Sequence, residues 1–277
     1  MGAESGAAQF WDCTNAEYHG SLDEDSHSSL DLFYESVEQY AAKRVFRTCP
    51  YPPPTPAMEF GTLFHTTVLE PHLLDEDYIA FEKFDKRTTV GKEGFADFCV
   101  RAGKRKAVTR EDLDMARAMF EGVMRNKEAR RLIEASGKCE CSLKSVDPDT
   151  GVKLKIRTDK LNDNGEIADL KTTQRVKPED FSKTTHNFGY HRQAALYLDV
   201  VKGLGMTGPM HFIAVSKQPP HECVVFHLGF NSLNLGRSEN KGILFELAFR
   251  RRANEWGGRH SGVSNEIEVP HYAFPRN

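Results

Sequence analysis

The stretch Glu166-Ile167-Ala168-Asp169-Leu170-Lys171-Thr172-Thr173 directly follows the turn residues Asp163-Asn164-Gly165. Its composition and its position after a turn predict a β-strand, yet a carboxylate (Asp169) and an amine (Lys171) lie two residues apart in an otherwise apolar run. A hairpin with this three-residue loop requires Gly165 in the left-handed conformation, which glycine adopts at little cost. The strands before and after the turn are therefore expected to pair in a fixed register.

This register brings two carboxylates together. Counting outward from the loop puts Asp159 opposite Asp169, with Cβ atoms roughly 5 Å apart, and alternation puts Lys171 on the same face. Like charges so close repel each other, and a divalent cation such as Mg²⁺ or Mn²⁺, which prefers oxygen ligands, would relieve the repulsion. The alternative is an ion-paired sheet surface, with Asp159 bound to Lys160 or Arg157 and Asp169 bound to Lys171.

The rest of the chain predicts a mixed α/β architecture, because segments of helical periodicity alternate with segments of period two. Residues 1–27 are polar and expected to be loose, and residues 83–106 are basic, punctuated by glycine and without a clear period. Helices are expected from residue 28 to before Cys49 and at about 58–69, 109–137, 189–201 and 233–256; strands are expected at about 139–146, 152–162, 165–171, 211–216 and 222–228.

Two further features bear on a site. His65 lies in an otherwise apolar helical segment, where a histidine is either a satisfied core residue or a ligand. Tyr190, Gln193 and Tyr197 fall on one face of a later helix, at spacings of three, four and seven residues. Polar groups repeated near an acidic pair indicate a site, although tyrosines packed with their hydroxyls at the rim of a core would give the same pattern.

Composition bounds the functional class. The 277 residues, 39% of them hydrophobic, suffice for a large buried core, and no segment approaches the roughly 18 to 20 apolar residues of a membrane span. We expect a cytoplasmic protein, because the first residues also lack the pattern of a secretory signal. The formal net charge of −3 does not indicate a nucleic-acid binder, although basic clusters occur locally. Of the six cysteines only Cys139 and Cys141 are close, and alternation places them on one face of a strand.

Taken together, these motifs resemble the PD-(D/E)XK nuclease superfamily, within it the RecB-type exonucleases, and they are most similar to the exonuclease VIII (RecE) branch of phages and prophages. The resemblance covers about residues 28–260. It rests on four short motifs in order, Gly61-Thr62-Leu63-Phe64-His65 with Leu69-Glu70-Pro71, Arg157-Thr158-Asp159, Ile167 to Thr173, and Tyr190 to Tyr197, with weaker matches at Asp85-Lys86-Arg87-Thr88, Gly91-Lys92 and Trp256.

The resemblance implies a fold and a metal site. The fold would be a restriction-endonuclease-like α/β core with a mixed central sheet flanked by helices and with helical additions at both ends. His65, Asp159 and Asp169 would be metal ligands together with the backbone carbonyl of Leu170, and Lys171 would be the catalytic lysine. The expected ion is Mg²⁺, with Mn²⁺ as a substitute.

The resemblance also implies how DNA is held. Gln193 and Tyr197 match a Gln-x-x-x-Tyr element that holds the DNA strand and the region of the active-site lysine, and Tyr190 lies on the same face. For the remaining DNA contacts we favour Lys104-Arg105-Lys106 over Arg250-Arg251-Arg252, because the former lies in an irregular, glycine-punctuated segment that can reach a groove.

Two departures from the family pattern stand out. Thr158 precedes Asp159 where relatives often have proline, and no cysteine follows Cys223, which excludes the branches that carry an iron–sulfur cluster. Glu140, on the first strand, is an additional acid that the sequence alone does not assign to a place in the site.

By resemblance, the chain is expected to be an Mg²⁺-dependent exodeoxyribonuclease that digests linear double-stranded DNA from its ends, 5′→3′, and leaves single strands for recombination by annealing. Implied partners are DNA ends, further copies in a ring-shaped homo-oligomer and a single-strand annealing protein, in a bacterial or phage-infected cell. Residues 28–277 would form one nuclease domain, with core motifs at 58–228 and a helical insertion at about 72–136. The alternatives are a structure-selective or nicking endonuclease on the same core, and a catalytically silent module that binds DNA or a partner.

Overall fold

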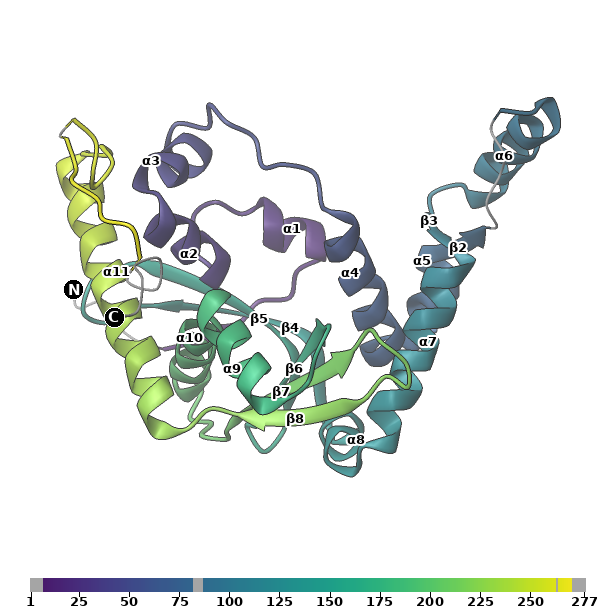
Figure 1. The fold of residues 1–277 in the computed structure, drawn as a ribbon. Coiled ribbons are helices and arrows are strands. Elements are labelled where there is room, and N and C mark those ends of the chain that lie inside the picture. Colours follow the sequence, from purple (N-terminus) through teal and green to yellow (C-terminus); the bar gives the residue numbers. More distant parts are fainter. Residues whose placement is uncertain (1–6, 82–86, 263, 271–277) are drawn as a thin grey trace, which may run out of the picture.

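A six-stranded mixed sheet forms the centre of the computed structural model, which describes residues 7–81, 87–262 and 264–270 (Figure 1). Neighbouring strands are antiparallel except β6 and β7, which are parallel and are connected through two helices. In spatial order the strands are β1 (Gln9–Phe10), β4 (Gly137–Val146), β5 (Lys153–Asn162), β6 (Ile167–Thr173), β7 (Met210–Ser216) and β8 (Cys223–His227).

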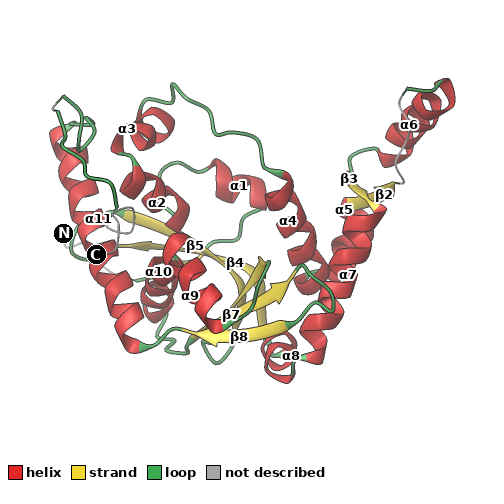
Figure 2. Cartoon of the chain, in the orientation of Figure 1, coloured by secondary structure: helices red, strands yellow, loops and turns green. Residues whose placement is uncertain are grey.

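Helices cover both faces of this sheet (Figure 2). They are α1 (Asn15–Gly20), α2 (His27–Glu35), α3 (Val37–Tyr40), α4 (Pro56–Leu69), α5 (Leu74–Asp77), α6 (Thr89–Ala102), α7 (Arg110–Arg125), α8 (Lys127–Glu134), α9 (Pro178–Asn187), α10 (Tyr190–Lys202) and α11 (Phe230–Ala253). One core, which includes Phe33 and Phe212, lies under α2, α3, α10 and α11. A second core, which includes Phe64 and Ile213, lies under α4, α7 and α8. The predicted α/β fold class is confirmed, and no described helix is long and apolar enough to cross a membrane.

Side-chain caps fix where the helices on the second core begin. Thr55 accepts a hydrogen bond from a backbone N–H of the first turn of α4, and Thr109 does the same for α7. The helix predicted to run from 109 to 137 is in fact two helices. Asn126 ends α7 in an extended conformation, and its side-chain oxygen accepts from the N–H groups of Glu128 and Ala129 to start α8.

The prediction that residues 1–27 are loose is wrong for the part of that segment that the structure describes. Strand β1 pairs with β4, and the Asp25 N–H donates to the Lys153 carbonyl at 2.8 Å. The Asp25 side chain is fully buried and contacts Arg44 at 3.2 Å and Arg251 at 2.6 Å. A polar composition concealed this anchor, because buried charges are stable where they are paired.

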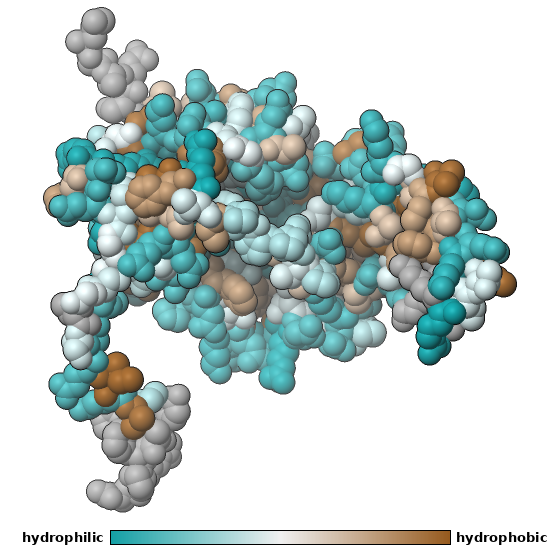
Figure 3. All heavy atoms as spheres, turned by 90° about the horizontal axis from the view of Figure 1, so that it is seen from above, coloured by the Kyte–Doolittle hydropathy of each residue, from teal (hydrophilic) through white to brown (hydrophobic). Residues whose placement is uncertain are grey.

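The segment 83–106, for which no period was evident, contains a helix and a strand. Helix α6 begins after the cap residue Thr88, and β3 (Lys106–Thr109) pairs in parallel with β2 (Tyr78–Phe81). In Figure 1 these elements project from the body beyond the upper end of α7, and in Figure 3 this arm lies at the right. Two of its side chains, Val90 and Val100, are about four-fifths exposed, at 79% and 83%. The weak motif residues Asp85 and Lys86 lie outside the described residues.

Candidate active site

The hairpin between β5 and β6 has the predicted loop and register. Gly165 has a φ of 85°, and its N–H donates to the Asn162 carbonyl at 2.8 Å. The Asn162 N–H donates in turn to the Glu166 carbonyl at 2.9 Å. From there the ladder extends to the pair Lys160 and Ala168, where it ends. The left-handed glycine therefore sets the register on which the acidic pair depends.

Beyond this point β5 and β6 separate, and the candidate site lies in the opening between them. The register puts Asp159 opposite Asp169, as predicted. The Asp159 carboxylate accepts a hydrogen bond from the Leu170 N–H at 2.7 Å, in place of a backbone acceptor. Helix α4 faces the opening from one side of the sheet, and α10 faces it from the other. Asp159 is thus held between two strands and accessible to groups from both helices.

Three residues form a candidate metal cluster on the α4 side: His65, Glu140 and Asp159, whose ligand atoms all lie within 4.8 Å of one another. His65 Nδ1 is 3.5 Å from Asp159 Oδ2 and 4.0 Å from Glu140 Oε1. His65 Nε2 lies 3.2 Å from the Leu170 carbonyl oxygen. All three side chains are partly exposed, so His65 is not an apolar core residue. The structure therefore brings together His65, Asp159 and the Leu170 carbonyl.

Glu140 completes this cluster, and the sequence analysis did not place it. Its neighbours along β4 pair with Lys160 and Thr158, so Glu140 lies opposite Asp159. Its φ of 47° is unusual for a residue other than glycine, and such strain concentrates at functional sites. Counting outward from the β4–β5 turn would have found this position, just as counting from the β5–β6 turn found Asp159.

The donor set fits a divalent cation. Burial, and then the charge of Asp159, raise the pKa of Glu140 to about 7. The charged form of Glu140 is therefore disfavoured in this site, and a bound cation would stabilise it. The two carboxylates supply oxygen atoms, which suit Mg²⁺ or Mn²⁺, and His65 Nδ1 adds one nitrogen, whereas the Leu170 carbonyl faces the other ring nitrogen of His65.

The left-handed conformation of Glu140 also corrects one prediction. Cys139 and Cys141 were expected on one face of the strand. Instead Cys139 packs against the core under α4 and α7, whereas Cys141 belongs to the core under α10 and α11. The side chains stop alternating where the backbone of Glu140 leaves the extended region.

Asp169 is not part of the three-residue cluster. Its side chain is almost fully buried, Oδ1 accepts from Gln193 Nε2 at 2.8 Å, and Oδ2 lies 2.7 Å from Lys171 Nζ. Burial raises the pKa of Asp169 to about 6, against the charge of Lys171 and together with that of Asp159. Burial is the largest single influence on Lys171 and disfavours its charged amine, but the charges of Asp169, Tyr190 and Asp159 and the hydrogen bond to Asp169 together raise the pKa of Lys171. This ion pair is one element of the alternative interpretation.

The polar face of α10 points at this ion pair. Lys171 Nζ lies 4.5 Å from the ring centroid of Tyr190, and Gln193 binds Asp169 directly. Tyr197 is buried, and burial, more than any neighbouring charge, raises its pKa well above the usual range. The three residues that share a helix face in sequence therefore lie on the Asp169 side of the opening. Arg157, the other cation considered for Asp159, instead donates to Ser142 Oγ at 2.7 Å.

The two basic clusters, 104–106 and 250–252, differ in position and in their contacts. Lys104-Arg105-Lys106 lies where α6 ends and β3 begins, on the arm that Figure 1 shows apart from α10, so a single chain does not bring it to the opening. In the second cluster, Arg250 binds Glu246 at 2.8 Å and Arg251 binds Asp25 at 2.6 Å. These two arginines stabilise the fold.

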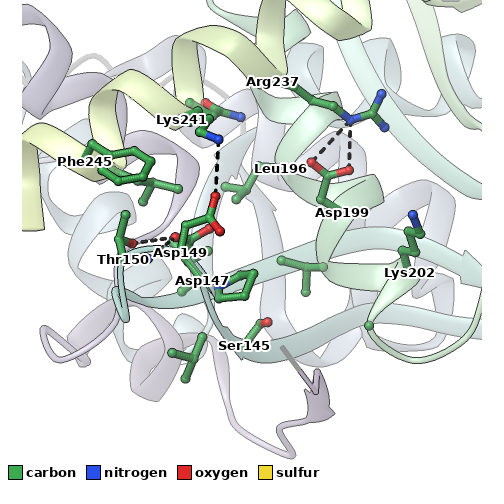
Figure 4. A pocket seen from close by; sticks show the side chains of 17 residues that line it. Ser145, Asp147, Asp149, Thr150, Leu196, Asp199, Lys202, Arg237, Lys241 and Phe245 are labelled. Carbon is green, nitrogen blue, oxygen red and sulfur yellow. Dashed lines mark hydrogen bonds and ion pairs between the residues drawn. The ribbon is translucent and has the colours of Figure 1, made fainter. Parts of the chain in front are cut away.

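A separate cavity of about 530 Å³ lies between the β4–β5 turn, α10 and α11 (Figure 4). Apolar side chains such as Leu196 form part of its wall. Arg237 pairs with Asp199 at 3.0 Å, and Lys241 pairs with Asp149 at 3.4 Å. Its lining contains none of the predicted site residues, so this cavity is distinct from the opening between β5 and β6.

Comparisons with known proteins agree with this geometry. Residues 26–259 match the family model described as a PDDEXK-like domain of unknown function (DUF3799). Among solved structures, the chain is similar to a crystal structure described as a "putative exonuclease" from Eubacterium rectale. The two share 17% sequence identity with a TM-score of 0.62, over 94% of this chain and 97% of that one. No curated protein matches the sequence at a significant level.

Proposed function

The chain belongs to the family described as a PDDEXK-like domain of unknown function (DUF3799), and from this premise we propose that it is a metal-dependent deoxyribonuclease that digests linear double-stranded DNA from its ends. One observation carries the proposal. Between β5 and β6 the cluster of His65, Glu140 and Asp159 lies beside a partly buried lysine, Lys171, which is ion-paired with Asp169. In metal-assisted phosphodiester hydrolysis an ion held by such groups activates water, and a nearby cation stabilises the charge that develops on the phosphate.

His65, Glu140, Asp159 and the Leu170 carbonyl would hold the ion. A bound divalent cation supplies positive charge that lowers the pKa of water and neutralises charge on the phosphate. The Asp159 carboxylate is positioned by its hydrogen bond from the Leu170 N–H, so the ligand atoms are oriented before any ion arrives. Asp169, opposite Asp159 in the register, is proposed as a further ligand in the complex with DNA.

Lys171 is the proposed catalytic cation. Asp169 holds its ammonium at 2.7 Å, and Gln193 fixes Asp169 from α10. The charged amine stabilises negative charge on the phosphate or orients the attacking water. Tyr190 lies against the same amine and limits its movement, and Tyr197 supports Gln193 from the following turn of the helix. The side chain of Gln193 therefore acts on Lys171 through Asp169.

End-directed digestion and 5′→3′ polarity are proposed from the resemblance to RecE-type exonucleases. The single strands produced would be used in recombination by annealing. The similarity to a protein described as a "putative exonuclease" supports an exonuclease over an endonuclease. We extend the proposal to a ring-shaped homo-oligomer. In such a ring, basic clusters such as Lys104-Arg105-Lys106 would line a channel despite the net charge of −3. Light scattering that shows a monomer at all micromolar concentrations would overturn the ring.

A digestion experiment tests the activity. A linear duplex labelled separately at its 5′ and 3′ ends is incubated with the protein and Mg²⁺ or EDTA, beside the same DNA as a closed circle. The proposal expects label release from 5′ ends, only with metal, and an intact circle. Cutting of the circle would indicate an endonuclease, and no cutting with any divalent metal would indicate a binding module.

A further inference from the structure

Phe188 is an exposed aromatic residue on a turn that leaves it little freedom. It follows the last residue of α9, its side chain is 63% exposed, and its N–H donates to the Thr184 carbonyl at 3.0 Å. The next residue, Gly189, has a φ of 63°. A Cβ at Gly189 would lie 2.5 Å from Arg192 Nη2, so a side chain here would be strained in conformation and would displace the end of Arg192.

Three polar side chains, Arg192, Asp31 and His27, hold this turn from the inside. Arg192 Nε donates to Asp31 Oδ1 at 2.9 Å, and His27 Nε2 lies 3.2 Å from Asp31 Oδ2. His27 also hydrogen-bonds the backbone of Phe188. The ring of Phe188 is therefore presented to solvent on a rigid support. The exposed ring of Phe188 contributes little to the stability of the fold, because an aromatic side chain stabilises mainly through the area that it buries.

The exposed ring is the outer end of a short aromatic stack that leads to Lys171. Phe188 stacks on Tyr190 with ring centroids 5.9 Å apart and an interplanar angle of 23°. Tyr190 stacks on Phe212 at 5.6 Å and 24°, and Lys171 Nζ lies 4.5 Å from the Tyr190 centroid. Two ring-sized steps thus separate Phe188 from the proposed catalytic amine.

We propose that Phe188 stacks on an unpaired nucleobase of the DNA strand whose phosphate lies at Lys171. The proposal rests on the proposed nuclease function. Every base offers a π-face, so such a contact tolerates any sequence. Bases inside a duplex already stack on their neighbours, so the ring takes up a base only where the end has opened. Phe188 is therefore a positioning residue that captures a frayed end and sets which phosphate meets the amine.

The test compares Phe188→Ala, Phe188→Leu and Phe188→Tyr with a control, Phe249→Ala, which removes an equally exposed ring from α11. Thermal unfolding establishes that each variant is folded. Cleavage of a linear duplex with Mg²⁺ gives KM and kcat for each variant. A second series of duplexes carries a single abasic site, placed in turn at each of the first nucleotides from the end. Binding of single-stranded DNA in EDTA gives affinity without cleavage.

Loss of one base–aromatic stack should raise KM for Phe188→Ala and Phe188→Leu by roughly 5- to 150-fold and weaken single-strand binding equally. Phe188→Tyr and Phe249→Ala should behave as wild type. An abasic site at the stacked position should reduce wild type to the level of Phe188→Ala and have no further effect on that variant.

If wild type cleaves DNA while Phe188→Ala matches Phe249→Ala, or if wild type ignores every abasic position, the stacking proposal is overturned and the nuclease assignment stands. If wild type neither binds nor cuts DNA, the proposed function fails, and the role of Phe188 in holding a base fails with it. Unchanged DNA kinetics together with a lost protein complex would assign the ring to a protein partner instead.

Discussion

Replacement of Asp25 by alanine should destabilise the whole fold, although Asp25 belongs to a segment whose composition indicates a loose terminus. The carboxylate is fully buried, and it accepts hydrogen bonds from Tyr40 Oη at 2.9 Å, from Ser29 Oγ at 3.0 Å and from Arg251, and it is ion-paired with Arg44. Removal of one partner from a buried ion pair typically costs about 3–5 kcal/mol. In the variant, Arg251 can turn towards water and Arg44 keeps its two backbone hydrogen-bond acceptors. We therefore expect Asp25→Ala to lower the free energy of unfolding by about 3 kcal/mol, the lower end of that range.

Denaturant unfolding of wild type, Asp25→Ala and the control Asp23→Ala measures this loss. Asp23 is exposed two residues away, and its replacement should change the free energy of unfolding by no more than about 0.5 kcal/mol. Equal stabilities for the two variants would refute the conclusion that the segment before α2 is anchored in the fold.

Three other predictions follow from particular contacts. Hydrogen bonds from Arg131 lower the pKa of Glu166 from 4.5 to about 2. The ionised Glu166 therefore stabilises the fold above pH 4.5, and this stabilisation is lost as the pH falls towards 2. In Arg131→Ala the free energy of unfolding should vary less between pH 4.5 and pH 2. Gly189→Ala should cost more stability than Gly205→Ala in denaturant unfolding, since φ is positive at both (63° and 79°) but only at Gly189 would the Cβ meet a guanidinium. Charge reversal of Lys104-Arg105-Lys106 should reduce the slope of log affinity for duplex DNA against log salt concentration by about 0.9 for each phosphate that the cluster neutralises, and an unchanged slope would exclude that cluster.

Local rules predicted the part of the site that lies on the hairpin. The loop with Gly165 fixed the register of Asp159 and Asp169, and alternation placed Lys171 beside Asp169. Helical periodicity placed Gln193 on the face that contacts Asp169. Each of these inferences depends on a geometric relation within one hairpin or one helix, where sequence distance determines spatial distance.

The remaining features depend on tertiary contacts. Counting from the β4–β5 turn places Glu140 opposite Asp159, but no propensity indicates its left-handed backbone conformation. The anchoring of Asp25 needs Arg251, which lies 226 residues further along the chain. In the sequence Phe188 has no distinguishing feature. Only the structure shows that its ring stacks on Tyr190 and that Arg192 and Asp31 surround the adjacent Gly189. Sequence periodicity and propensity describe the average behaviour of residue types, so they do not predict these individual long-range contacts.

The dependence of DNA cleavage on Mg²⁺ concentration, for wild type and Glu140→Gln, tests the central claim most directly. Glu140→Gln keeps the shape of the side chain but removes one charged ligand oxygen from the cluster, whereas Glu134→Gln, at an exposed position of α8, is the matched control. Loss of residues that only support metal ligands typically costs about 10–100-fold in metal affinity or activity, so loss of a ligand should cost at least as much. The account predicts that Glu140→Gln needs at least about tenfold more Mg²⁺ for half-maximal cleavage, with Glu134→Gln unchanged. Identical Mg²⁺ dependence in all three proteins would contradict it.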